Sequence, residues 1–180
     1  SSAGDIKFTN SQGLLTLAPN ETSFAVSNAA SNGKINIVTV GTGAALTTNG
    51  VVQALNGGLF NQVQLASSGL LTIGAGSTIQ SARTVLLNAA DLDVQGAVSG
   101  VNIDVTGLGS FHNIQLGVTG DVIGNATVEV SPAEVNLLNA SSELSFGQFS
   151  SFTRNITVTT PINITTASPQ VLLKSSALGI

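Results

Sequence analysis

The residues that decide the fold are Gly69-Leu-Leu-Thr-Ile-Gly-Ala-Gly-Ser-Thr-Ile79 and, a few positions on, Val85-Leu-Leu-Asn-Ala-Ala-Asp-Leu-Asp-Val-Gln-Gly-Ala-Val-Ser-Gly-Val-Asn-Ile-Asp-Val105. Apolar and polar side chains alternate in Asp91–Gln95 and again in Val101–Thr106, which is the period of two expected of a strand with one buried face. Glycine or serine interrupts the apolar runs after a few residues. The stretch therefore predicts short β-strands joined by tight turns.

The same pattern extends outward through the rest of the chain. Short apolar segments recur about every nine residues, from Ile6–Thr9 to Gln170–Lys174. The expected strands include Glu134–Leu138 and Ile162–Thr166. Three Asn-Gly dipeptides add strong turn signals between the apolar segments.

The composition also supports an all-β fold. Apolar residues make up 42% of the 180 residues and charged residues only 8%, whereas about a quarter of the residues are charged in a typical globular protein. Val, Ile and Thr suit a pleated surface, and the abundant Asn, Ser and Gly suit turns. The chain is long enough for one domain whose core needs neither disulfides nor metal.

Internal repetition indicates how the strands are arranged. Three pairs of segments match at offsets of 51, 56 and 66 residues: Gly58–Gly69 with Gly109–Gly120, Gly13–Leu17 with Gly69–Ile73, and Ile35–Gly43 with Val101–Gly109. Each offset fits three coils of about 17 to 22 residues, which is the kind of period that indicates a solenoid. Repeats of this kind stack so that each one contacts only its neighbours.

We therefore expect a single-domain β-solenoid, and more specifically a right-handed parallel β-helix. Its coils would stack at about 4.8 Å and fill a narrow interior with small branched residues in columns. The alternative is a β-sandwich with donor-strand exchange. A sandwich of this size more often contains a large buried aromatic residue such as Trp, and the chain has neither Trp nor Tyr.

The runs beginning at Gly69 and Val85 resemble filamentous-haemagglutinin-type repeats. The resemblance covers roughly the middle half of the chain. Proteins of that family are secreted, right-handed parallel β-helices used as adhesins and matrix fibres. The resemblance therefore implies an exported protein that acts through its surface.

The character of the sequence changes at Phe146. A phenylalanine cluster comes first, two alternating strands then flank Pro161, and a last apolar stretch follows Pro169. Proline between strands belongs at a turn or an edge. We expect a solenoid body over residues 1–145 and a distinct C-terminal strand segment over 146–180, acting as a cap or as an inter-subunit segment. The expected subunit-interface residues are Val171, Leu172 and Leu173.

Candidate catalytic groups are few. Asp91 and Asp93 lie two apart on one expected strand, with Asp104 and Asp121 downstream. Paired carboxylates can cleave glycosides, but we interpret these residues as solvated positions between buried Leu and Val. His112 is the one histidine, which argues against a Ser-His-Asp triad.

Metal sites are not expected either. The pair of aspartates could bind Ca²⁺ together with backbone carbonyls, but no Gly-Gly-x-Gly-x-Asp repeat occurs. A single histidine cannot form a zinc cluster of several histidines within one chain. The sequence therefore predicts no catalytic residues, no cofactor and no metal, and we expect a protein that is not an enzyme.

Possible glycosylation sites occur mostly in the last third of the chain. The Asn-x-Ser/Thr pattern is found at Asn20, Asn125, Asn139, Asn155 and Asn163. Glycans at such positions would add solubility to a surface that carries few charges.

The charge and hydropathy of the chain argue against two kinds of surroundings, a nucleic-acid partner and the interior of a membrane. A net charge of −4 with five basic residues argues against binding nucleic acid. No apolar run approaches the roughly 18 residues of a membrane-spanning helix. The absence of Cys and Met, both oxidisable, suits an extracellular or cell-surface location.

Together these features predict a structural subunit of an extracellular filament or surface fibre. The expected partner is a second copy of the chain, joined by β-strand end-stacking or strand exchange, because open solenoid ends expose unpaired backbone groups. The first alternative is a surface adhesin that recognises a host or cell-surface receptor or a glycan. A solenoid carbohydrate-active enzyme is a third, for which a convincing site is lacking.

Overall fold

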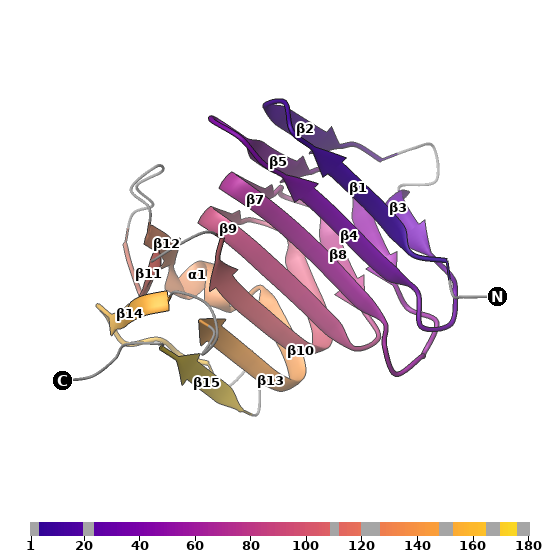
Figure 1. Ribbon diagram of the computed structural model, residues 1–180. Helices are drawn as coiled ribbons and strands as arrows, with labels where there is room; N and C mark the ends of the chain where they lie inside the picture. Colours follow the sequence, from indigo (N-terminus) through magenta and orange to yellow (C-terminus); the bar gives the residue numbers. More distant parts are fainter. Residues whose placement is uncertain are drawn as a thin grey trace.

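The computed structural model describes residues 4–19, 24–108, 112–119, 127–147, 153–164 and 170–175. The elements are β1 (Ile6–Asn10), β2 (Leu14–Leu17), β3 (Phe24–Asn28), β4 (Lys34–Thr39), β5 (Ala45–Thr48), β6 (Val51–Ala54), β7 (Gln62–Ile73), β8 (Thr78–Ser81), β9 (Thr84–Val94), β10 (Ala97–Gly107), β11 (His112–Leu116), β12 (Thr127–Val130), α1 (Pro132–Val135), β13 (Leu138–Gly147), β14 (Thr153–Val158) and β15 (Val171–Lys174). Strands from successive coils lie side by side and form a layered body (Figure 1).

Every strand pairing among these residues is parallel, and the pairings define three faces. The first face stacks β1, β4, β7, β9, β10, β13 and β15. The second face begins with β2, β5, β7 and β9, and the third contains β3, β6, β8, β10 and β13. The long strands turn a corner and contribute to two faces, with register shifts at Ser67/Leu70 in β7 and Gly100/Asn102 in β10.

The core of the first face consists of two columns of inward side chains, with one residue from each strand. The first column is Ile6, Ile35, Val63, Val85, Ile103, Leu144 and Val171. The second is Phe8, Ile37, Leu65, Leu87, Val105, Phe146 and Leu173. The five internal members of each column are buried, so the alternation seen in the sequence becomes a continuous apolar interior.

The order of the strands in the second face differs from their order along the chain. β11 pairs on one side with β12 and on the other with β14, and β12 also contacts β9. β12 thus lies between β9 and β11, although it follows β11 in the chain. One coil therefore contributes two strands to this face, and with them the second face, like the first, holds seven of the described strands.

Side-chain amides support the corners between the third and first faces. The Asn28 side chain donates to the carbonyl oxygens of Gly4 at 2.7 Å and Lys34 at 3.1 Å. One coil later, the Asn61 side chain donates to the Gly33 carbonyl at 3.2 Å. Each of these contacts gives a backbone carbonyl near the corner a side-chain donor.

The structure confirms an all-β fold of parallel coils in the solenoid class. A β-sandwich does not describe it, because sandwiches are built of antiparallel sheets. The expected division at residue 146 falls within β13 (Leu138–Gly147), whose Phe146 belongs to the second core column of the first face.

Two expected strands differ in the structure. Residues 162–164 lie outside any strand, and residues 165–166 lie outside the described residues. The strand expected at Glu134–Leu138 is wrong for all but its last residue, because Pro132–Val135 forms the short helix α1, a turn follows, and β13 begins at Leu138. Ser131 caps this helix, Pro132 follows at the first turn and Glu134 completes a capping box. This local chemistry favours a helical turn over a strand.

Candidate functional site

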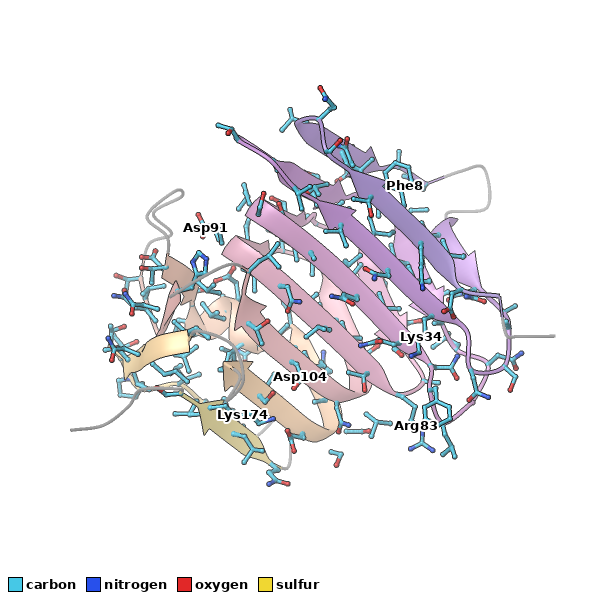
Figure 2. All side chains as sticks on the ribbon, viewed as in Figure 1. Phe8, Lys34, Arg83, Asp91, Asp104 and Lys174 are labelled. Atoms are coloured by element: carbon cyan, nitrogen blue, oxygen red, sulfur yellow. The ribbon has the colours of Figure 1, made fainter. Side chains whose placement is uncertain are left out.

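The two ends of the solenoid are the places where the strand ladders stop. Among the described strands, β1, β2 and β3 at the N-terminal end each pair on one side only, as do β14 and β15 at the C-terminal end. An edge of this kind presents unpaired N–H and C=O groups to any further strand. Figure 2 labels Phe8 on β1 and Lys174 on β15, at opposite ends of the body.

The N-terminal end exposes side chains that belong to core columns. Phe8 occupies the same column as Ile37, which is buried, yet it is 50% exposed because no described strand covers it. On β2, Leu15 and Leu17 begin the two inward columns of the second face, and both are half-buried. The outward-facing Leu14 is also exposed. The end of the core is therefore apolar and partly open.

The C-terminal end also exposes apolar side chains, and one of them, Leu173, is the opposite end of the column that begins at Phe8. Leu173 on β15 is 51% exposed, and Val158 on β14 is 53% exposed. Between these strands lies a hollow of about 260 Å³. Its lining is apolar and includes Phe146, Val158, Ile162, Ile164, Val171 and Leu173. The hollow is the open end of the core between the first and second faces.

The three residues expected at a subunit interface all lie on β15. Val171 and Leu172 are half-buried, whereas Leu173 is exposed. Lys174 fastens the strand to its neighbours: its Nζ lies 2.9 Å from Glu143 Oε1 and 3.9 Å from Asp104 Oδ1. The Ser145 hydroxyl donates to the same Asp104 carboxylate. β15 is thus held in place, and its outer edge has no partner among the described strands.

The expectation that Asp91 and Asp93 are both solvated is wrong for Asp91. Asp91 is only 2% exposed, and its Oδ1 accepts a hydrogen bond from Leu92 N at 3.0 Å. Asp93 is half-buried and accepts from Gln95 Nε2 at 2.8 Å. The reason is a bend in β9: the buried positions follow a period of two up to Asp91 and then restart at Leu92.

Sequence reasoning missed the buried carboxylate of Glu134. Its Oε1 accepts from Val94 N at 2.8 Å and its Oε2 accepts from Ser131 N at 2.7 Å. Burial raises the pKa of Glu134, and the hydrogen bonds from Ser131 and Val94 oppose that rise. The Ser-x-x-Glu spacing of residues 131–134 was the available signal. Glu134 thus joins α1 to the edge of β9.

The other candidate chemical groups are dispersed. Asp104 lies on the first face and His112 on β11 of the second face, and Asp121 lies outside the described residues. Within the described ranges, no group of three or more His, Asp or Glu side chains is arranged to hold a metal ion. Among the described residues, the hollow beside Asp104 and Lys174 is about 200 Å³, which is smaller than the apolar hollow of about 260 Å³ beside β15.

Three of the five predicted glycosylation sites can be placed. Asn139, Asn155 and Asn163 are exposed, whereas Asn20 and Asn125 lie outside the described residues. The side-chain amide of Asn139 lies 3.3 Å from the Leu137 carbonyl, and that of Asn155 lies 3.4 Å from Asn113 Oδ1. Their exposure leaves the three side chains accessible, and their modification stays a prediction.

Two further results concern the chain as a whole. In the part of the chain that the structure describes, no helix is long and apolar enough to cross a membrane. In comparisons with known proteins, no family model, no curated protein and no solved structure matches the chain. Function is therefore inferred from the geometry of the two ends.

Proposed function

We propose that this chain is a structural subunit of an extracellular filament, in which copies join end to end through their terminal coils. The single observation that carries the proposal is that each end combines one-sided strand edges with exposed apolar side chains from core columns. Exposed, unblocked edges are templates for further strand pairing. Few charges oppose it, since only 8% of the residues are charged.

The two ends differ, and this difference favours a filament over a closed dimer. One end presents β1 and β2, and the other presents β14 and β15. Contact between unlike patches is heterologous, and it generates an open polymer when the rotation between subunits does not close a ring. The coils are expected to wind in the right-handed sense, which connections between parallel strands strongly favour.

The extracellular assignment rests on composition and on resemblance. The chain has no Cys and no Met, so it lacks the two most oxidisable side chains. The resemblance of its central runs to haemagglutinin-type repeats supports the same location. Export and filament formation together would make the chain a surface or matrix fibre.

Electron microscopy and fibre diffraction of the purified 180-residue chain test this function. We expect unbranched filaments whose diffraction shows a reflection at about 4.8 Å along the fibre axis, because the strands run across that axis. Sedimentation velocity should show growth with protein concentration. Folded protein that stays monomeric at every concentration would contradict the proposal.

A second candidate function, surface adhesion, is favoured by the turn between β6 and β7. Leu55, Leu59 and Phe60 are exposed there, and Phe60 is 65% exposed. The turn lies on a corner between coils, away from both end edges. If it binds a receptor, Phe60→Asp should abolish attachment to cells or matrix while filaments form normally. Unchanged attachment would remove this candidate.

A further inference from the structure

We propose that the N-terminal end of one copy docks on the C-terminal end of the next in one defined register, with Phe8 of the second copy seated in the apolar hollow beside β15. This inference rests on the proposed function and specifies its contact. The occupant of the hollow is therefore a second copy of this chain.

The register follows from the core columns of the first face. Phe8 and Leu173 are the two end members of a single column, and Ile6 and Val171 are the end members of the column beside it. Placing β1 of a second copy next to β15 in the parallel sense continues both columns. Phe8 then lies beside Leu173, and Ile6 lies beside Val171.

The second face ends at the same level as the first. Each face holds seven described strands, because the extra strand β12 lengthens the second face by one step. When β1 of the second copy meets β15, its β2 therefore meets β14. The inward residues Leu15 and Leu17 of β2 would then continue the columns that end at Ile156 and Val158.

The hollow accommodates the ring that this register places over it. Its volume is about 260 Å³ and its lining is apolar. A cavity of about 150 Å³ with an apolar lining already accepts benzene, so a phenyl ring fits. Phe8 loses its 50% exposure in this contact and Leu173 its 51% exposure, so the two half-exposed ends cover each other.

Disulfide trapping tests the register. The chain contains no cysteine, so any disulfide that forms must join the introduced thiols. Adjacent strands place paired Cα atoms within the reach of a disulfide, whereas pairs more than about 7 Å apart cannot bridge. Within one molecule Phe8 and Leu173 are six strand steps apart, or about 29 Å. A chain carrying Phe8→Cys and Leu173→Cys should therefore form a ladder of covalent multimers on oxidation.

The matched control for trapping carries Phe60→Cys with Leu173→Cys. Phe60 is more exposed than Phe8 but lies on a corner turn of an internal coil. We expect no covalent ladder from this pair. A ladder from the control equal to that from the end-to-end pair would overturn the register.

Mixing two blocked variants tests the polarity. Phe8→Asp disables the N-terminal end and Leu173→Asp disables the C-terminal end, so each variant alone should stay monomeric. Mixed in equal amounts, they should form dimers and nothing larger, because one functional end of each remains. Phe60→Asp should form filaments of normal length. Circular dichroism of each variant checks that it is folded.

The outcomes separate this inference from the proposed function. The ladder and the dimers together support the register. Wild-type filaments that give no ladder at positions 8 and 173, or variants that give no dimers when mixed, overturn the register and leave the filament function standing. A wild-type chain that never forms filaments overturns both.

Discussion

At the residue scale, the close approach of two coils explains why a glycine, Gly69, lies at the corner in β7. A Cβ atom added to Gly69 would lie less than 3.0 Å from the carbonyl oxygen of Ala44 in the preceding coil. The contact is with backbone, which cannot rotate away as a flexible side chain can. Gly69 therefore allows the chain to turn from the first face to the second at the normal spacing of the coils.

Buried carboxylates accept hydrogen bonds from backbone N–H groups at the edge of β9. Asp91 accepts from Leu92 N and Glu134 accepts from Val94 N, so two side chains bind donors at the edge of β9 where β12 is not paired with it. A buried N–H without an acceptor costs about 1–3 kcal/mol. These carboxylates thus lower the free-energy cost of leaving β9 unpaired with β12 at the boundary between the two sheets.

Glu134 predicts a pH dependence of stability. Its pKa is raised above the usual 4.5, first because burial desolvates the carboxylate. The folded protein therefore keeps this proton at a pH at which the unfolded chain has lost it. It follows that this group's contribution to the free energy of unfolding falls as the pH rises from 4.5 through the raised pKa.

Comparison with Glu134→Gln isolates this contribution. The variant has no proton to lose, so its stability lacks that fall. Urea unfolding at several pH values should show wild type losing stability relative to Glu134→Gln as the pH rises toward neutrality. Curves for the two proteins that run parallel across this range would contradict the assignment of the raised pKa to Glu134.

At the element scale, β15 is a short strand that pairs with one strand, β13, among those that the structure describes, which leaves its other edge without a described partner. It pairs with β13 through Val171–Lys174 and gains an ion pair between Lys174 and Glu143. Its central residue Leu173 is exposed. Strands of this kind open at low free-energy cost, whereas core strands such as β7 and β9 open only with global unfolding.

Hydrogen exchange should therefore distinguish the strands. In the monomer, we expect the amides of Val171–Lys174 to exchange much faster than those of β7 and β9. In filaments, the same amides should become protected, because a neighbouring β1 would cover the open edge. Mass spectrometry of peptides from both states measures this. Equal protection of β15 in monomer and filament would show that its edge is not a subunit contact.

At the scale of the whole molecule, the two ends expose apolar side chains that their association would bury, so this association should strengthen on warming. Hydrophobic association is driven by entropy near room temperature and weakens on cooling. The net charge of −4 is small for 180 residues, so salt should matter less than temperature.

The critical concentration for assembly measures this balance. It should fall on warming from about 5 to 25 °C, and it should change by less than about threefold between roughly 0.05 and 0.5 M NaCl, because screening has few charges to act on. Light scattering of the full chain at several concentrations gives the value. A strong dependence on salt with none on temperature would indicate ion pairs rather than apolar ends.

The fold class was predictable from the amino-acid sequence, because the period of two is a local property of a strand with one buried face. For example, one of the short apolar segments of this pattern, Leu14–Leu17, forms β2. The sequence match between Gly13–Leu17 and Gly69–Ile73 also corresponds to stacking in the structure. Leu14 and Leu70 both pair with Ala45 of β5, so they lie in one column.

The register between coils depends on tertiary contacts and was not predictable from the sequence. The sequence match pairs Ile35 with Val101, but the column places Ile35 with Ile103. Residues 58–69 and 109–120 match in sequence, yet β7 begins on the first face and β11 lies on the second. The first column advances by 29, 28, 22 and 18 residues from Ile6 to Ile103, because the turns differ in length.

The candidate site was likewise predictable from the sequence only in part. Sequence alone indicated Val171, Leu172 and Leu173 as an apolar terminal strand, because their pattern is local. The position of Phe8 in the column that ends at Leu173, and the insertion of β12 that brings two faces to one level, depend on contacts between residues far apart in the chain. Such contacts are set by stacking of whole coils, which no local pattern records.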